Sequence, residues 1–97
     1  GENVYSTEVE NAIATHDAVA AVAVVGLPDD KWGERVHAVV VLHPDAAVTE
    51  EEIREHAKSS IAGYKSPRTV DFVDALPVSG AGKILKRDLR AKYSAVE

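Results

Sequence analysis

The first apolar positions of the chain have the spacing of a helix. Val9 and Ile13 lie four residues apart, which places them on one helical face. Just before them, Thr7 is followed three residues later by Glu10, the spacing of a capping box. The pattern predicts a short helix over residues 7–15.

Two runs rich in β-branched residues follow this helix. Residues 19–27 (VAAVAVVGL) and 35–43 (RVHAVVVLH) are almost continuously apolar, as expected for buried strands. The segment between them, 28–34, is polar and contains a proline and a glycine, so it predicts a loop. Because this loop is short, the two strands are expected to pair antiparallel.

A second capping box opens the next helix. Thr49 is followed by Glu52, and three consecutive glutamates occupy the first turn, where the helix dipole favours them. The pattern predicts a helix over 50–61 that ends at Gly63. Its apolar stripe repeats every four residues: Ile53, Ala57 and Ile61.

The last third contains one more strand and one more helix. Residues 69–74 (TVDFVD) alternate, with Val70 and Phe72 on one side, which predicts a short strand at a sheet edge. The Pro- and Gly-containing segment 75–82 is not expected to be regular, and 88–93 is expected to be helical. The order αββαβα predicts an α+β fold in which helices pack on a three-stranded sheet, with residues 1–97 as a single domain.

Composition indicates a folded domain with a thin core. Leu, Ile, Val and Phe make up 25 of the 97 residues, above the level at which charged chains stay disordered. Much of the apolar content is small, however, with 15 Ala and 15 Val against five Leu and one Phe. We therefore expect marginal stability or a missing partner surface. Because the first residue is Gly1 rather than Met, we expect the chain to be a piece of a longer protein.

Charge is unevenly distributed and changes the class of partner expected. Residues 1–57 carry three Lys or Arg against twelve Asp or Glu, whereas 58–97 carry eight against four. A nucleic-acid module would be basic throughout, so we expect a local anion site in the last third and no nucleic-acid partner. No apolar run approaches the roughly 20 residues of a membrane span, and cysteine is absent. A soluble, cytoplasmic protein without a transmembrane segment is expected.

Few residues are candidates for chemistry by spacing alone. No serine lies in a GxSxG motif, and the segment that ends at Lys83 fails the P-loop pattern because Ile84 follows the lysine. What remains is a lysine at the end of a Pro/Gly loop, which could move it to an anion; a solvated basic tail is the other interpretation. Four histidines lack metal-ligand spacing, so we expect no metal site: His16, His37, His43 and His56.

Four segments, in order along the chain, resemble the C-terminal domain of the adenylate-forming enzymes. This superfamily includes acyl-CoA synthetases, firefly-type luciferases and peptide-synthetase adenylation domains. The chain is most similar to the acyl-CoA synthetase branch. The matching segments are 1–10 (GENVYSTEVE), 25–34 (VGLPDDKWGE), 64–68 (YKSPR) and 76–90, which contains GKILK.

The resemblance implies a two-step reaction in the full enzyme. A carboxylic acid, which the resemblance to this branch implies is a fatty acid, reacts with Mg-ATP to form an acyl-adenylate, and CoA then displaces AMP. The family's C-terminal domain rotates between the steps, and its adenylation lysine falls on Lys83. For the thioester step, Glu2 and Asn3 match the lining of the pantetheine passage. The positions that match those facing the CoA nucleotide are Tyr64, Lys65 and Arg68.

The resemblance also implies what this chain lacks. The N-terminal AMP-binding domain, which holds ATP, Mg²⁺ and the acyl group, lies outside it, so the fragment alone is expected to bind none of them tightly and to be inactive. Ala81 replaces the family's common threonine, and Ser66 stands where some members have a basic residue. Two rival hypotheses stay open: a peptide-synthetase adenylation subdomain, whose acceptor is a carrier protein, and a free-standing binding module.

Overall fold

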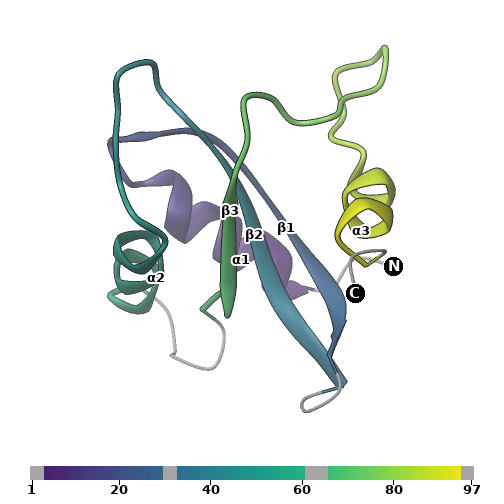
Figure 1. Ribbon diagram of the computed structural model, residues 1–97, viewed down its shortest axis with the longest axis horizontal. Helices are drawn as coiled ribbons and strands as arrows, with labels where there is room; N and C mark the ends of the chain where they lie inside the picture. Colours follow the sequence, from purple (N-terminus) through teal and green to yellow (C-terminus); the bar gives the residue numbers. More distant parts are fainter. Residues whose placement is uncertain (1–3, 30–32, 61–65, 95–97) are drawn as a thin grey trace.

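The computed structural model describes residues 4–29, 33–60 and 66–94. Helices and strands follow one another in the predicted order, and the α+β fold class is confirmed (Figure 1). The elements are α1 (Val4–Ala14), β1 (Val19–Asp29), β2 (Gly33–Leu42), α2 (Glu50–Lys58), β3 (Thr69–Phe72) and α3 (Lys86–Ser94).

The three strands form one mixed sheet in the order β1-β2-β3. β1 and β2 pair antiparallel, as predicted, from Val19 opposite Leu42 to Asp29 opposite Gly33. β3 pairs parallel with β2, and α2 lies in the connection that the parallel pairing requires. The prediction that β3 is an edge strand is confirmed.

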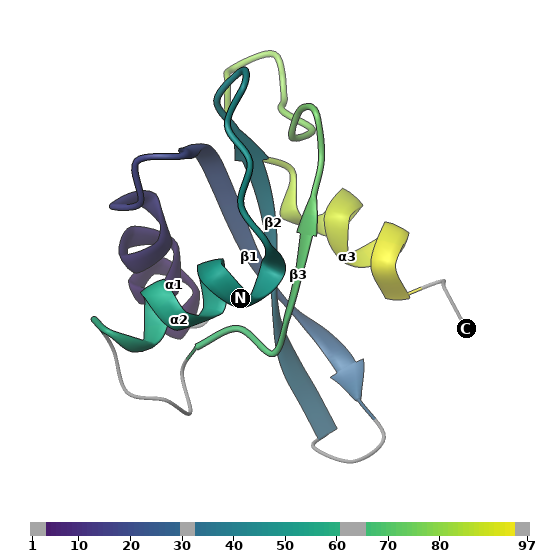
Figure 2. The same ribbon diagram turned by 60° about the vertical axis from the view of Figure 1, so that its left-hand side comes forward.

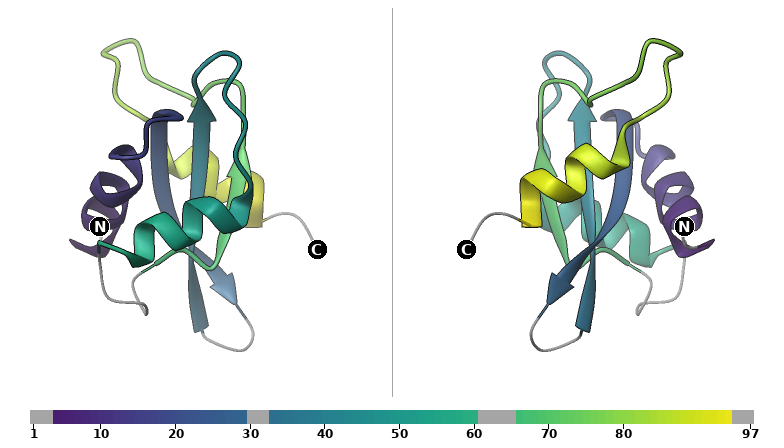
Figure 3. Two further views of the ribbon diagram at one scale, coloured as in Figure 1. Left: turned by 90° about the vertical axis from the view of Figure 1, so that its left-hand side faces the viewer. Right: turned by 90° about the vertical axis from the view of Figure 1, so that its right-hand side faces the viewer.

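Helices cover both faces of this sheet. Figures 2 and 3 show α1 and α2 on one face and α3 on the other. Because side chains alternate along a strand, each face has its own apolar cluster. The cluster under α1 and α2 includes Val24, Val40 and Ile53, whereas the cluster under α3 includes Val25 and Leu89. The small residues noted in the sequence therefore serve two thin core layers instead of one thick one.

The first helix corrects one prediction. α1 begins at Val4, so Thr7 lies inside the helix and the predicted capping box at Thr7 is wrong. Glu10 instead accepts a hydrogen bond from the amide of Val24 at 2.8 Å and pairs with Lys86. The Glu10 carboxylate thus binds residues far away in the sequence, and not the helix start that the capping box would have used.

The strand boundaries also differ from prediction. β1 continues to Asp29, and β2 already begins at Gly33, so both strands include part of the segment 28–34 that was expected to be a loop. Pro28 is accommodated because β1 is an edge strand, where a missing amide donor is tolerated. β3 ends at Phe72, two residues earlier than expected.

The second capping box is confirmed. The Thr49 hydroxyl accepts from the Glu52 amide at 3.1 Å, and the Thr49 amide donates to the Glu52 carboxylate at 2.8 Å. α2 ends at Lys58, earlier than predicted, and Ile61 and Gly63 lie outside the described residues. α3 begins two residues before the predicted start.

Candidate functional site

The structure describes two of the six residues predicted for the site. Lys83 follows a turn between β3 and α3, and Arg68 precedes β3 directly; both side chains are exposed. The other four, Glu2, Asn3, Tyr64 and Lys65, lie outside the described residues.

Lys83 lies on a small hairpin, residues 77–85, which we call the Lys83 hairpin. Val78 and Ile84 form a single antiparallel bridge. The amide of Ser79 donates to the Lys83 carbonyl at 2.8 Å, and the amide of Leu85 donates to the Pro77 carbonyl at 2.9 Å. As expected, residues 75–82 contain no helix or strand, but local backbone bonds close the segment into a hairpin.

Ser79 and Gly82 build the turn at the tip of this hairpin. The amide of Gly82 donates to the Ser79 carbonyl at 2.9 Å, and Gly82 has a φ of +84°, which favours glycine. The Ser79 hydroxyl accepts from the amides of Ala81 and Lys83, at 3.2 and 3.3 Å. The backbone of Lys83 is thus bound through both its amide and its carbonyl, and its side chain stays exposed.

An ion pair anchors the base of the Lys83 hairpin. The Nζ atom of Lys86 lies 2.7 Å from the carboxylate of Glu10 on α1, and these side chains are only 16% and 21% exposed. A surface depression of about 610 Å³ runs along residues 82–87 beside this pair. Lys83 therefore lies among further cations of the basic last third of the chain.

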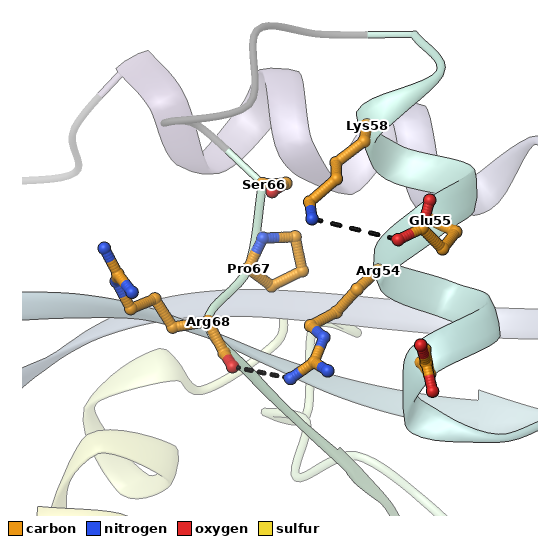
Figure 4. Close-up of a pocket in the computed structure, with 7 residues that line it drawn as sticks. Arg54, Glu55, Lys58, Ser66, Pro67 and Arg68 are labelled. Atoms are coloured by element: carbon orange, nitrogen blue, oxygen red, sulfur yellow. Dashed lines mark hydrogen bonds and ion pairs between the residues drawn. The ribbon is translucent and has the colours of Figure 1, made fainter.

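Arg68 lies beside a cleft between α2 and the segment 66–68 (Figure 4). The cleft has a volume of about 360 Å³ and is lined by acidic and basic side chains. Two hydrogen bonds hold the backbone of the segment. The Arg68 amide donates to the Val36 carbonyl at 2.9 Å, and the guanidinium of Arg54 donates to the Arg68 carbonyl at 3.1 Å. In Figure 4 the guanidinium of Arg68 points away from α2, whereas Lys58 points into the cleft and pairs with Glu55.

The structure does not bring Lys83 and Arg68 together. Arg68 precedes the start of β3, and the Lys83 hairpin follows its end, so they lie at opposite ends of this strand. Figure 1 shows the hairpin at the top of the molecule, whereas β3 begins in the lower half. The two side chains therefore belong to separate parts of the surface of the domain.

Three of the four histidines, His16, His37 and His56, have structural partners among the described residues. His37 is 5% exposed, and its Nδ1 atom lies 2.6 Å from the Thr69 hydroxyl. Its Nε2 atom is buried without a hydrogen-bond partner among the described residues, and burial lowers the pKa of His37. His16 and His56 pack ring to ring at 4.9 Å. Within residues 4–29, 33–60 and 66–94, no group of three or more His, Asp or Glu residues could hold a metal ion.

Sequence reasoning missed two features of this site, the turn at Ser79 and the pairing of Glu10 with Lys86. Ser79 stands in a segment that we expected to be irregular, although a serine three residues before a glycine is a recognisable turn signal. Glu10 and Lys86 are 76 positions apart, so no spacing rule could pair them.

In the part of the chain that the structure describes, no helix has the length and apolar character needed to cross a membrane.

Comparison with known proteins identifies the family. Residues 8–83 match the family model of the AMP-binding enzyme C-terminal domain. The chain is 47% identical over 95 residues to a long-chain-fatty-acid–CoA ligase of Mycobacterium tuberculosis, covering 98% of this chain and 19% of the relative. It is 41% identical over 93 residues to the fatty acid–[acyl-carrier-protein] ligase ScoC of Streptomyces coeruleorubidus. That match covers 96% of this chain and 18% of the relative.

The fold agrees with this assignment. Apo MatB from Rhodopseudomonas palustris, a solved crystal structure, superposes with a TM-score of 0.91 at 38% identity, covering 99% of this chain and 19% of that one. The chain thus spans about a fifth of the length of the relatives that it matches. By family match, sequence identity and fold, the chain belongs to the AMP-binding enzyme C-terminal domain family.

Proposed function

We propose that this chain is the mobile C-terminal domain of an ATP-dependent acyl-CoA synthetase. The full enzyme activates a carboxylic acid, in our proposal a fatty acid, to an acyl-adenylate and then transfers the acyl group to CoA. Its AMP-binding N-terminal domain, outside this chain, holds the acyl group, ATP and the Mg²⁺ that accompanies ATP. The similarity to a long-chain-fatty-acid–CoA ligase supports this assignment.

The observation that carries the proposal is the presentation of Lys83. Its backbone is fixed in a closed hairpin, and its side chain is exposed beyond the end of the sheet. When a carboxylate approaches the α-phosphate of ATP, negative charge gathers between the two groups. A positioned ammonium group stabilises that charge, and it does so best when it needs no reorganisation during the reaction. We assign this role in adenylation to Lys83.

The thioester step would use the other end of the domain. Arg68 carries its charge away from α2, at the opposite end of β3 from Lys83. If the domain rotates between steps, Arg68 turns toward the nucleotide of CoA, whose phosphates it would contact. We assign Tyr64 and Lys65 to the same nucleotide, and Glu2 and Asn3 to the pantetheine passage; these four remain predictions from the sequence.

A carrier protein is the second candidate acceptor. The similarity to a fatty acid–[acyl-carrier-protein] ligase favours it, because that relative matches 96% of this chain. The adenylation step and the role of Lys83 are the same in both cases. Assays of the full enzyme with CoA and with a phosphopantetheinyl carrier protein would distinguish the two acceptors.

Lys83→Ala in the full-length enzyme tests the proposed function. We expect acyl-adenylate formation to fall by roughly 10²-fold or more, the scale of removing one preorganised charge from a transition state. Thioester formation from supplied acyl-adenylate should stay near wild type, because Lys83 would then be turned away from the site. Both half-reactions are measured by pre-steady-state quench.

Lys92→Ala is the matched control, since it removes another exposed lysine, from α3, that has no assigned role. It should leave both half-reactions unchanged. Equal losses in the two half-reactions of Lys83→Ala, or no loss in either, would contradict the assignment of Lys83.

A further inference from the structure

The carboxylate of Glu10 connects three elements. The same oxygen, Oε2, accepts a hydrogen bond from the Val24 amide at 2.8 Å and lies 2.7 Å from Nζ of Lys86. Val24 lies in β1, at the edge of the sheet, so its amide has no strand to bond on the outer side. One oxygen of Glu10 therefore accepts from an otherwise unpaired amide at the sheet edge and also pairs with Lys86, the first residue of α3.

This arrangement joins the two faces of the sheet. α1 covers one face and α3 covers the other, as both views of Figure 3 show. The Glu10–Lys86 pair passes around the β1 edge and connects them. Both side chains are mostly buried, so water screens their attraction less than it screens a surface pair.

The ion pair meets a well-packed element at each end. Glu10 stands on α1, whose Val9 and Ile13 are fully buried in the core beneath it. Lys86 begins α3, whose Leu89 is buried in the cluster on the other face, and Ile84 at the base of the Lys83 hairpin packs against that cluster. The residues from Ser79 to Lys83, beyond Ile84, are exposed or only partly buried. The pair is thus the polar link that joins α1 to the base of a hairpin whose tip projects from the core.

We propose that the Glu10–Lys86 ion pair positions Lys83 for adenylation by fixing the base of the Lys83 hairpin to α1 and β1. This inference rests on the role of Lys83 in the proposed function. Glu10 and Lys86 are positioning residues and do not touch the reactants. Loss of the pair removes the polar link to α1, while the packing of Ile84 and the internal hydrogen bonds of the hairpin persist, so the fold is kept and Lys83 shifts out of alignment.

Lys86→Met in the full-length enzyme tests this proposal, because it keeps the side-chain length and removes the charge. The kcat for acyl-adenylate formation should fall roughly 10- to 100-fold, the cost of a displacement of about 1 Å at a reacting centre. The KM for ATP and the thioester half-reaction should stay within about twofold of wild type. Lys86→Arg, which restores the cation, should recover most of the lost rate.

A double-mutant cycle supplies the second measurement. Glu10→Gln keeps an acceptor for the Val24 amide but removes the charge, so it should lower the adenylation rate in the same way as Lys86→Met. The double variant should be no slower than the slower single variant, because both remove the same interaction. Lys92→Met is the matched control and should leave both half-reactions unchanged.

Three results would overturn the positioning role. They are a wild-type adenylation rate in Lys86→Met, additive losses in the double variant, and a loss shared equally by both half-reactions, which a merely structural role would produce. Lys83→Ala, measured in the same assay, separates the two hypotheses. If Lys83→Ala loses adenylation and Lys86→Met does not, the ion-pair proposal fails and the proposed function stands.

Discussion

The two ends of β3 present their cations in different ways. At one end, the backbone hydrogen bonds of the Lys83 hairpin are mainly internal, and the hairpin meets the rest of the domain at its base, through the packing of Ile84 and the pair at Lys86. At the other end, the backbone of Arg68 is bonded to β2 on one side and to Arg54 of α2 on the other, and Ser66 and Pro67 beside it are buried. The backbone of Lys83 is thus held by bonds within its own hairpin, whereas that of Arg68 is bonded directly to two elements of the core.

This contrast matches the demands of the two proposed roles. A lysine that stabilises a transition state must be placed within a fraction of an ångström, and it has to enter a site in another domain. A projecting hairpin with an internally bonded turn meets both demands. An arginine that binds phosphate by charge tolerates more freedom, since its long side chain adjusts to the ligand. Changes at the two ends should therefore affect different kinetic constants.

After Lys83→Ala and Lys86→Met, the next largest effect is expected at the turn of the Lys83 hairpin. Gly82→Ala places a side chain at a φ of +84°, which costs about 1 to 2 kcal/mol for a residue other than glycine. If the turn shifts to relieve this strain, adenylation should slow by roughly five- to thirtyfold, the rate equivalent of that energy. The thioester half-reaction should not change.

Gly80→Ala is a closely matched control for Gly82→Ala. A Cβ atom at either position meets nothing within 4 Å, and the two glycines differ in that only Gly82 has a positive φ. Gly80→Ala should therefore keep the wild-type rate. If the two variants were equally impaired, the turn geometry would not be what positions Lys83.

A smaller effect is expected at the other end of β3. Arg68→Glu should raise the KM for CoA by about fivefold, the upper range for one exposed ionic contact, while adenylation stays near wild type. The ratio of mutant to wild-type KM should shrink in a salt series, because screening weakens exposed contacts. Arg90→Glu makes the same charge change on α3 and should leave the KM for CoA unaltered.

The competing explanation for Arg68 is a purely structural role. In that case Arg68→Glu would lower the melting temperature and depress both half-reactions together, with the KM for CoA unmoved. The assignment to CoA would then be withdrawn, whereas the assignment of Lys83 would be unaffected.

The smallest effect is expected in the sheet itself, where the buried His37 of β2 should make the stability of the domain depend on pH. Burial lowers the pKa of His37; Arg35 acts in the same direction, while Asp71 and Glu50 oppose it. The unfolded chain takes up this proton near pH 6.5, and the folded chain takes it up only at lower pH. The free energy of unfolding should therefore fall as the pH drops below about 6.5. Urea unfolding of the chain between pH 5 and 8 would measure this slope.

His37→Gln should flatten that slope, because it removes the titrating group and keeps a side chain able to bond with Thr69. A second decrease in the free energy of unfolding is expected above pH 10. Burial and the neighbouring Asp71 raise the pKa of Tyr93 to about 12, so the unfolded chain loses the Tyr93 proton at a lower pH than the folded chain does. A stability that rises on acidification from pH 7 to 5 would show that His37 is not buried as a neutral group.

Local sequence rules predicted several features that depend on neighbours in the chain. The Thr49–Glu52 capping box is formed as predicted, and both bonds lie within four residues. The β-branched runs became β1 and β2, as their apolar side chains predicted. Lys83 at the end of a Pro/Gly loop was visible too, although the local hydrogen bonds that close its hairpin were not predicted.

Tertiary structure decided what depends on residues far apart in the chain. Glu10 left its predicted cap because the β1 edge and Lys86 offered it a buried amide and a buried cation, which bind a carboxylate more strongly than an exposed helix end. The parallel pairing of β3 with β2 set the backbone of Arg68 beside Val36, whose carbonyl accepts from its amide. Sequence alone thus determined which residues carry the charge. Only the packing of the sheet decided where each charge points, because direction depends on contacts that no local spacing encodes.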